Sequence, residues 1–262
     1  MNYSDYRYFR FERDAGVLRV FFGRPKELNR INAPMHTEMA RLFDDIARDS
    51  ATKVVVLTGD GPAFTAGGDM TWFQQMTRPE LDLLIIEGRH IVTTLLDLPQ
   101  PIIAAVNGAS AGLGTTVALM CDVIFAAEGA RLADPHVRIG VGAGDGGAVI
   151  WPLLVGMSRA KQYLLTGDSV SAAEAERIGL INRVTNAETL LPETMELARR
   201  LANGPTMAIR ATKESLNKIL RERVNLVLDT SLALEKECFL SRDHKEAIDA
   251  FLEKRSPAFV GA

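Results

Sequence analysis

Ala63-Phe64-Thr65-Ala66-Gly67-Gly68-Asp69-Met70 is a glycine-rich turn that follows the apolar run Val54 to Gly59. A second turn of the same kind, Asn107-Gly108-Ala109-Ser110-Ala111-Gly112-Leu113-Gly114, follows the apolar run Ile102 to Val106. Glycine adopts backbone conformations that are closed to other residues and lets a ligand approach the chain closely. Two such turns can direct two backbone N–H groups at one oxygen, which suits an enzyme that holds negative charge on a carbonyl oxygen.

The remaining pattern predicts an α/β protein. Short runs rich in β-branched or aromatic residues at 17–22 and 54–58 are typical of strands that are covered on both faces of a sheet. Helices are expected from Ala33-Pro34 through Ile46, over 79–98 and over 114–120, with a further strand over 123–127. Because strands and helices alternate, we expect a mostly parallel core built by crossover connections.

The last part of the chain changes character, because strand signals fade from about residue 158. Ser171 and Glu174 form a capping-box pattern, and Gly179 is placed to end the short helix that starts there. Helical patterns then fill 188–203, 206–220, 222–241 and 243–254. We therefore divide the chain into an α/β core, residues 1–190, and a helical C-terminal region, residues 191–262.

Composition excludes several classes of partner. The 30 Lys and Arg nearly balance the 33 Asp and Glu and are scattered, so neither nucleic acid nor a membrane surface is an expected partner. Pro101 to Met120 is uncharged, but its Pro, Asn and glycines favour a buried strand, turn and helix over a membrane span. Cys121 and Cys238 lack metal-ligand spacing, so we expect a reduced, cytoplasmic protein with no disulfide and no metal site.

Several motifs, taken in order along the chain, resemble the crotonase (enoyl-CoA hydratase/isomerase) superfamily over nearly the whole length. They are Arg24-Pro25 with Leu28-Asn29, the turn Phe64 to Met70, the segment Pro101 to Gly108, Cys121-Asp122, Gly146-Gly147, Leu165-Thr166-Gly167, the stretch Ala172 to Val184 and the ending Phe251 to Phe259. The resemblance implies a spiral of ββα units and a C-terminal helical region that builds homotrimers, often dimers of trimers. It also implies a small-molecule acyl-CoA substrate between these two parts, with coenzyme A belonging to the substrate and no separate cofactor.

The same resemblance assigns roles to particular residues. The backbone N–H groups of Gly68 and Leu113 would hold the thioester oxygen, which is consistent with Leu113 lying in the first turn of a helix. The Ala66 carbonyl would receive the adenine amino group of coenzyme A, and Lys26 would contact a phosphate. Thr116 and Trp72 are candidate substrate contacts, although Trp72 and Trp151 also fit a packing role.

The acid–base residues depart from the hydratase pattern. Typical hydratases carry one glutamate in the helix after the second glycine-rich turn and another after a proline further on; here those positions are Thr116 and His136. The chain offers His136 together with Asp145, and a histidine beside a carboxylate is a standard proton-transfer pair. The competing interpretation is structural: Asp145 caps the helix that begins near Gly146, and His136 is an ordinary loop residue.

Two smaller branches of the superfamily also bear on the site. The spacing of His136 and Asp145 resembles β-diketone hydrolases such as 6-oxocamphor hydrolase, which add a glutamate from the helical region; Glu235 is the candidate here. Aryl-CoA dehalogenases use an aspartate and a histidine, for which Asp145 and His90 are the candidates. His36 and His244 are expected at the surface of amphipathic helices.

Three functions follow from these observations. The leading one is an acyl-CoA enzyme of the hydratase/isomerase type, with His136 and Asp145 replacing the glutamates and a thioester enolate held by the glycine-rich turns. The second is a hydrolase that cleaves a C–C bond of a β-diketone or β-ketoacyl substrate by retro-Claisen chemistry. The third is a crotonase-fold binding module without catalytic activity.

Overall fold

The centre of the protein is a six-stranded sheet with strand order β1-β2-β3-β5-β7-β10. The computed structural model describes residues 3–262. Strand β1 pairs antiparallel with β2, and all other pairs in this sheet are parallel. The strands are β1 (Phe9–Asp14), β2 (Val17–Phe22), β3 (Val54–Gly59), β5 (Ile102–Val106), β7 (Val123–Ala127) and β10 (Arg183–Thr185).

A smaller four-stranded sheet lies beside it, in the order β4-β6-β8-β9. Its strands are β4 (Ala63–Thr65), β6 (Ala109–Ala111), β8 (Arg131–Ala133) and β9 (Val170–Ser171). The chain passes from the large sheet to the small one three times, in β3–β4, β5–β6 and β7–β8, and a helix follows each pair. These ββα repeats confirm the predicted α/β class and its spiral arrangement.

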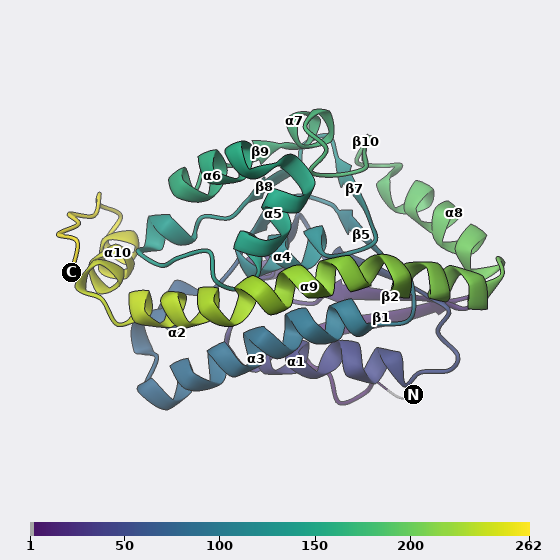
Figure 1. Cartoon of the computed structure of the whole chain (residues 1–262), viewed down its shortest axis with the longest axis horizontal. Helices are drawn as coiled ribbons and strands as arrows, with labels where there is room; N and C mark the ends of the chain where they lie inside the picture. Colours follow the sequence, from purple (N-terminus) through teal and green to yellow (C-terminus); the bar gives the residue numbers. More distant parts are fainter. Residues whose placement is uncertain (1–2) are drawn as a thin grey trace.

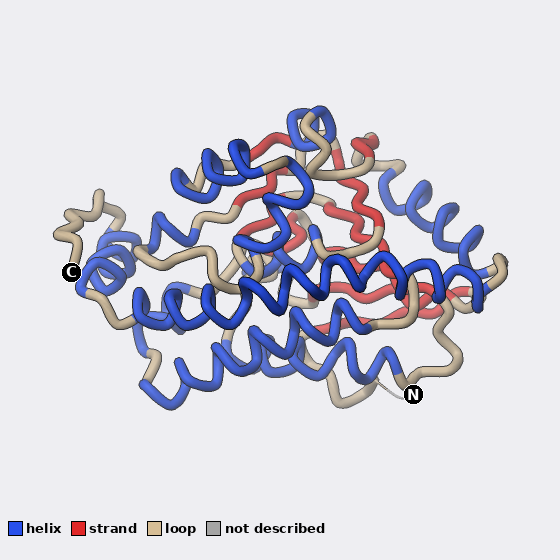
Figure 2. The backbone as a smooth tube through the Cα atoms, viewed as in Figure 1, coloured by secondary structure: helices blue, strands red, loops and turns tan. Residues whose placement is uncertain are grey.

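Helices surround the sheets, as Figure 2 shows, and the longest of them, α9, crosses one side of the molecule beside α3 (Figure 1). Helix α8 packs on strands β2, β3, β5 and β7 of the large sheet. The helices are α1 (Ala33–Ala47), α2 (Met70–Gln75), α3 (Arg78–Asp97), α4 (Leu113–Leu119), α5 (Gly147–Val155), α6 (Met157–Thr166), α7 (Ala172–Arg177), α8 (Leu190–Ala202), α9 (Thr206–Phe239) and α10 (Arg242–Glu253), with short 3-10 turns η1 (Pro25–Glu27) and η2 (His136–Ile139). Within residues 3–262, no helix is both long and apolar enough to span a membrane.

Local sequence signals explain where several elements begin. The Asn32 side chain accepts a hydrogen bond from the Met35 N–H and caps α1, which has a proline in its first turn. The Ser171 side chain accepts from the Glu174 N–H at the start of α7, as predicted. Every residue of β3 and β5 is buried, which accounts for their continuous apolar sequence.

Three expectations were wrong. The patterns at 206–220 and 222–241 belong to one continuous helix, α9. Strands β9 and β10 lie beyond the point where strand signals fade; both are short and pair with strands far away in the chain. His36 and His244 are buried rather than at the surface, with 3% and 6% of their area exposed.

Candidate active site

The two glycine-rich turns meet at one cavity, which both Gly68 and Leu113 line. A Cβ at Gly68 would lie 2.3 Å from the Phe73 ring, so a larger residue there would displace that ring. Gly112 has a φ of +55° and directly precedes α4, so Leu113 is the first residue of that helix. Within residues 3–262, the N–H groups of Gly68 and Leu113 donate no hydrogen bond, so both remain available to a ligand.

The cavity is small and mostly apolar, with a volume of about 90 Å³. Its apolar side chains come from the loop before α1, from α2, α3 and α9, and from η2: Ile31, Met70, Trp72, Phe73, Leu84, Leu232, Phe239 and Ile139. Its polar side chains are His36, His136, Asp145 and Glu235. An apolar cavity with a few convergent polar groups is typical of a small-molecule site.

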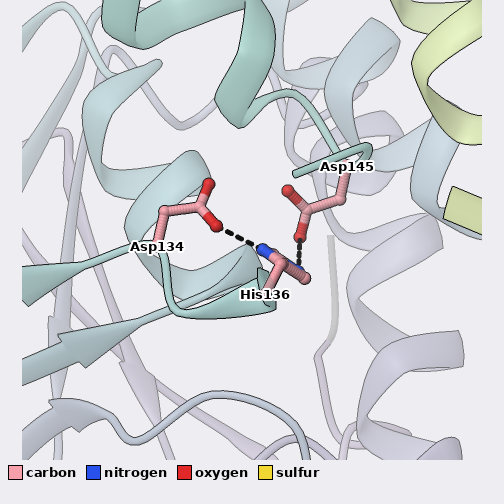
Figure 3. A group of neighbouring side chains, drawn as sticks. All are labelled: Asp134, His136 and Asp145. Carbon is pink, nitrogen blue, oxygen red and sulfur yellow. Dashed lines mark hydrogen bonds and ion pairs between the residues drawn. The ribbon is translucent and has the colours of Figure 1, made fainter. Parts of the chain in front are cut away.

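His136 stands between two aspartates (Figure 3). It begins η2 just after β8, and its Nδ1 forms a hydrogen bond with Asp134 Oδ1. Its Nε2 lies 3.3 Å from Asp145 Oδ2. Both ring nitrogens therefore face carboxylate oxygens, an arrangement that fits an imidazole carrying protons to and from a substrate.

Asp145 is fixed from its other side by Thr116. The Thr116 Oγ1 donates a hydrogen bond of 2.9 Å to Asp145 Oδ1, and both residues are buried. Asp145 stands just before α5, which begins at Gly147 with Gly146 as its N-cap. Asp145 therefore contacts His136 as predicted, but the N-cap position of α5 belongs to Gly146, so the predicted capping role is wrong.

Glu235 reaches the same histidine from α9, with its Oε1 3.7 Å from His136 Nε2. Only 2% of Glu235 is exposed, and among residues 3–262 its buried Oε2 has no hydrogen-bond partner. One turn earlier on α9, Ser231 Oγ donates a hydrogen bond of 2.8 Å to the Gly144 carbonyl. A Cβ at Gly144 would lie 2.4 Å from the Glu235 Cβ, so the glycine allows this close approach.

The charges in this cluster are strongly coupled. Burial lowers the pKa of the His136 imidazole, but the Asp134 and Asp145 carboxylates outweigh that effect and hold this pKa well above its usual value. Burial raises the pKa of Asp145, yet His136, Thr116 and Gly147 bring it below the usual range. Burial raises the pKa of the Glu235 carboxyl well above its usual value. The cluster therefore holds charged and neutral groups side by side, as proton transfer requires.

The other predicted site residues lie in different places. Ala66 and Trp72 line the cavity. Thr116 is fully buried behind Asp145 and is outside the set of described residues that line the cavity, so it positions a carboxylate. Lys26 lies in the exposed turn η1, away from the cavity wall. His90 is about half exposed, pairs with Asp44 on α1 at 2.9 Å and is outside the described residues that line the cavity.

Sequence reasoning missed Asp134 as a member of the site. Its Oδ1 binds the His136 ring, while among the described residues its buried Oδ2 has no hydrogen-bond partner. The signal was present, because Asp134 stands two positions before His136 in Asp134-Pro135-His136. An aspartate that close to a candidate catalytic histidine can orient its ring.

The chain is similar to known proteins over nearly its whole length. A family model described as enoyl-CoA hydratase/isomerase matches residues 12–262. The short-chain-enoyl-CoA hydratase of Clostridium acetobutylicum is 36% identical over 249 residues, covering 93% of this chain and 94% of that protein. A crystal structure of an enoyl-CoA hydratase/isomerase from Mycobacterium paratuberculosis is similar with a TM-score of 0.91 at 33% identity, covering 94% of this chain and 99% of that one. A β-diketone hydrolase from the cyanobacterium Anabaena is similar with a TM-score of 0.84 at 32% identity, covering 90% and 96%.

Proposed function

Because the chain belongs to the enoyl-CoA hydratase/isomerase family, we propose that it is an acyl-CoA enzyme that forms a thioester enolate and moves protons with His136. The observation that carries this proposal is the meeting of two groups at one cavity: the free N–H groups of Gly68 and Leu113, and the buried His136 cluster. The first would stabilise negative charge, and the second would supply or remove a proton.

The two N–H groups would act as an oxyanion hole. Leu113 is the first residue of α4, where the N–H groups lack partners in the helix and the helix dipole is positive. A thioester oxygen placed between Gly68 and Leu113 would accept two hydrogen bonds as the enolate forms. Removal of one such donor typically costs roughly 3–4 kcal/mol of transition-state stabilisation.

His136 would replace the two glutamates of typical hydratases. Asp134 accepts from Nδ1, which fixes the ring orientation and leaves Nε2 toward Asp145, Glu235 and the cavity. A positioned imidazole commonly contributes a factor of about 10²–10⁴ to a rate by proton transfer. The carboxylate partners on both ring nitrogens of His136 argue against a binding module without catalytic activity.

Coenzyme A would enter as part of the substrate. The Ala66 carbonyl at the cavity wall would receive the adenine amino group, and the exposed Lys26 would contact a phosphate. The reaction would need no separate cofactor. The helical region, residues 191–262, would build a homotrimer or a dimer of trimers, and light scattering of the purified protein measures its mass directly.

A second function is favoured by one specific observation, the position of Glu235. The cluster of His136, Asp145 and Glu235 fits retro-Claisen hydrolysis, in which His136 activates a water and the N–H groups hold the enolate leaving group. The similar β-diketone hydrolase structure supports this alternative. A simple β-diketone contains no coenzyme A, so binding of thioesters separates the two functions.

The experiment is a thermal unfolding series with free CoA, acetoacetyl-CoA and a cyclic β-diketone. A ligand at about a hundred times its Kd adds about 2.7 kcal/mol to the free energy of unfolding, which a melting curve detects. A shift with the thioester is expected, followed by turnover of a panel of enoyl-CoA substrates. A shift with the diketone alone would contradict the acyl-CoA function and favour C–C cleavage.

A further inference from the structure

A second buried histidine, His36, lines the cavity from α1, which precedes both glycine-rich turns in the sequence. His36 on α1 pairs with Glu87 on α3, and its Nδ1 lies 2.6 Å from Glu87 Oε2. Only 3% of His36 and 9% of Glu87 are exposed. Burial of a polar pair costs free energy, so the position of His36 in the wall of a cavity lined mostly by apolar side chains calls for a reason.

The unpaired nitrogen of the His36 ring indicates a binding role. His36 lines the cavity, and its Nδ1 is engaged by Glu87; within residues 3–262, its Nε2 has no hydrogen-bond partner. The Trp72 ring packs 5.8 Å from the His36 ring, centre to centre, and the buried indole Nε1 likewise has no partner among the described residues. The His36 Nε2 is therefore left for something inside the cavity.

Gly88, next to Glu87, provides room at the same wall. It lies inside α3, where glycine is less favourable than alanine. Neither backbone conformation nor crowding requires a glycine here: it is outside the positive-φ residues, and the nearest atom to an added Cβ is Leu232 Cδ2 at 3.9 Å. Because Gly88 lines the cavity, the missing side chain leaves space for ligand atoms.

We propose that His36, Glu87 and Gly88 form a second polar subsite, which binds a hydroxyl or carbonyl oxygen carried by the acyl group. The preferred substrates are then oxygenated acyl thioesters, and plain alkyl thioesters are poorer ligands. A plain alkyl chain would bury the His36 Nε2 without a partner, whereas an oxygen would satisfy it. This inference rests on the proposed acyl-CoA function and names the substrate class for it.

Calorimetric titration of saturated ligands tests the subsite without turnover. Hexanoyl-CoA is compared with 4-oxohexanoyl-CoA and 5-oxohexanoyl-CoA. The wild-type protein is expected to bind at least one oxo ligand tenfold or more tightly than hexanoyl-CoA. In H36L this preference should disappear. Equal affinities in the wild type, or a preference that survives in H36L, would overturn the subsite.

Two further variants guard against a folding defect. H36L leaves Glu87 unpaired, so H36L/E87L, which removes both partners, is measured beside it and should show the same loss of preference. G88A should raise the melting temperature, as expected for alanine in a helix, and yet weaken the oxo ligand at least tenfold. Unchanged binding in G88A would contradict the role of this space.

A different result would contradict the proposed function itself. A folded protein that binds none of the three thioesters overturns the acyl-CoA function. The subsite is then measured with cyclohexane-1,3-dione against cyclohexanone, where the wild type should prefer the dione and H36L should not. Equal binding of these two compounds would overturn the subsite itself.

Discussion

Glu235 Oε1 lies 3.7 Å from His136 Nε2, although the two residues belong to α9 and to the turn after β8. The hydrogen bond from Ser231 to the Gly144 carbonyl sets the position of α9 against the loop that carries Asp145. Three carboxyl groups therefore surround one imidazole: Asp134, Asp145 and Glu235. The predictions below ask what each part of this cluster contributes.

Replacement of His136 tests the proton-transfer group. H136A should lower kcat at least about a hundredfold, because a positioned imidazole contributes a factor of about 10²–10⁴. The Kd for a saturated acyl-CoA should stay nearly unchanged. Steady-state kinetics and calorimetric titration measure the two quantities, and H90A, on the exposed side of α3, is the matched control. A kcat within threefold of the wild type would remove His136 from the mechanism.

Replacement of Leu113 by proline removes a single N–H group. Proline is tolerated at the first position of a helix, which is where Leu113 lies, so L113P should unfold close to the wild-type temperature. Its kcat should fall by a factor of about 10²–10³, the usual cost of one oxyanion donor. L113A loses the side chain but keeps the N–H group and is the control. Similar kinetics for L113P and L113A would argue against the oxyanion role.

The Asp134 carboxylate should govern both the orientation and the pKa of His136. Burial lowers this pKa, while the Asp134 and Asp145 carboxylates hold it above its usual value, so D134N should shift it downward. We expect kcat to fall at least about tenfold, because an amide does not fix the ring as the carboxylate does. The pH–rate profile and the NMR titration of the imidazole report the shift. D168N, which removes a surface partner of Arg138, should change neither; an unshifted profile in D134N would contradict this role.

Glu235 should make stability fall as the pH rises. Burial raises the pKa of its carboxyl in the folded state well above 4.5, so above that pH the unfolded chain releases a proton that the folded protein keeps. The free energy of unfolding then decreases with pH, from about pH 4.5 up to the folded-state pKa, by at most roughly 1.4 kcal/mol per pH unit. E235Q lacks this proton, so its slope should be less steep between pH 5 and pH 6 in urea titrations. Parallel slopes for the two proteins would show that Glu235 is ionised when folded.

Local patterns in the sequence were sufficient for most of the fold. The apolar runs of β2, β3, β5 and β7 and the caps at Asn32 and Ser171 act over a few residues, so they can be recognised without the structure. Strands β9 and β10 could not, because their short segments become strands only by pairing with β8 and β7. The sequence did not predict one continuous helix α9, because charged residues in its middle interrupt the apolar pattern. These residues face solvent on a helix that the rest of the protein covers only partly.

The candidate site was predictable only in part. His136 and Asp145 stand out in one loop, and the structure brings them together, but their contact with Glu235 depends on how α9 packs against Gly144. His36 was expected at the surface because it lies in an amphipathic helix. Its spacing of three and seven positions from Met39 and Phe43 on the apolar face of α1 was the signal for burial. Its partner Glu87 on α3 could come only from tertiary structure.

The most direct test of the central claim is exchange of the α-protons of a saturated acyl-CoA in D₂O, followed by mass spectrometry. Exchange requires the two events assigned to this cavity, enolate stabilisation by Gly68 and Leu113 and proton removal by His136. The account predicts deuterium incorporation with the wild-type protein and a loss of at least about a hundredfold in both H136A and L113P. Exchange that proceeds at the wild-type rate in these two variants, or no exchange with a wild-type protein that binds the thioester, would contradict it.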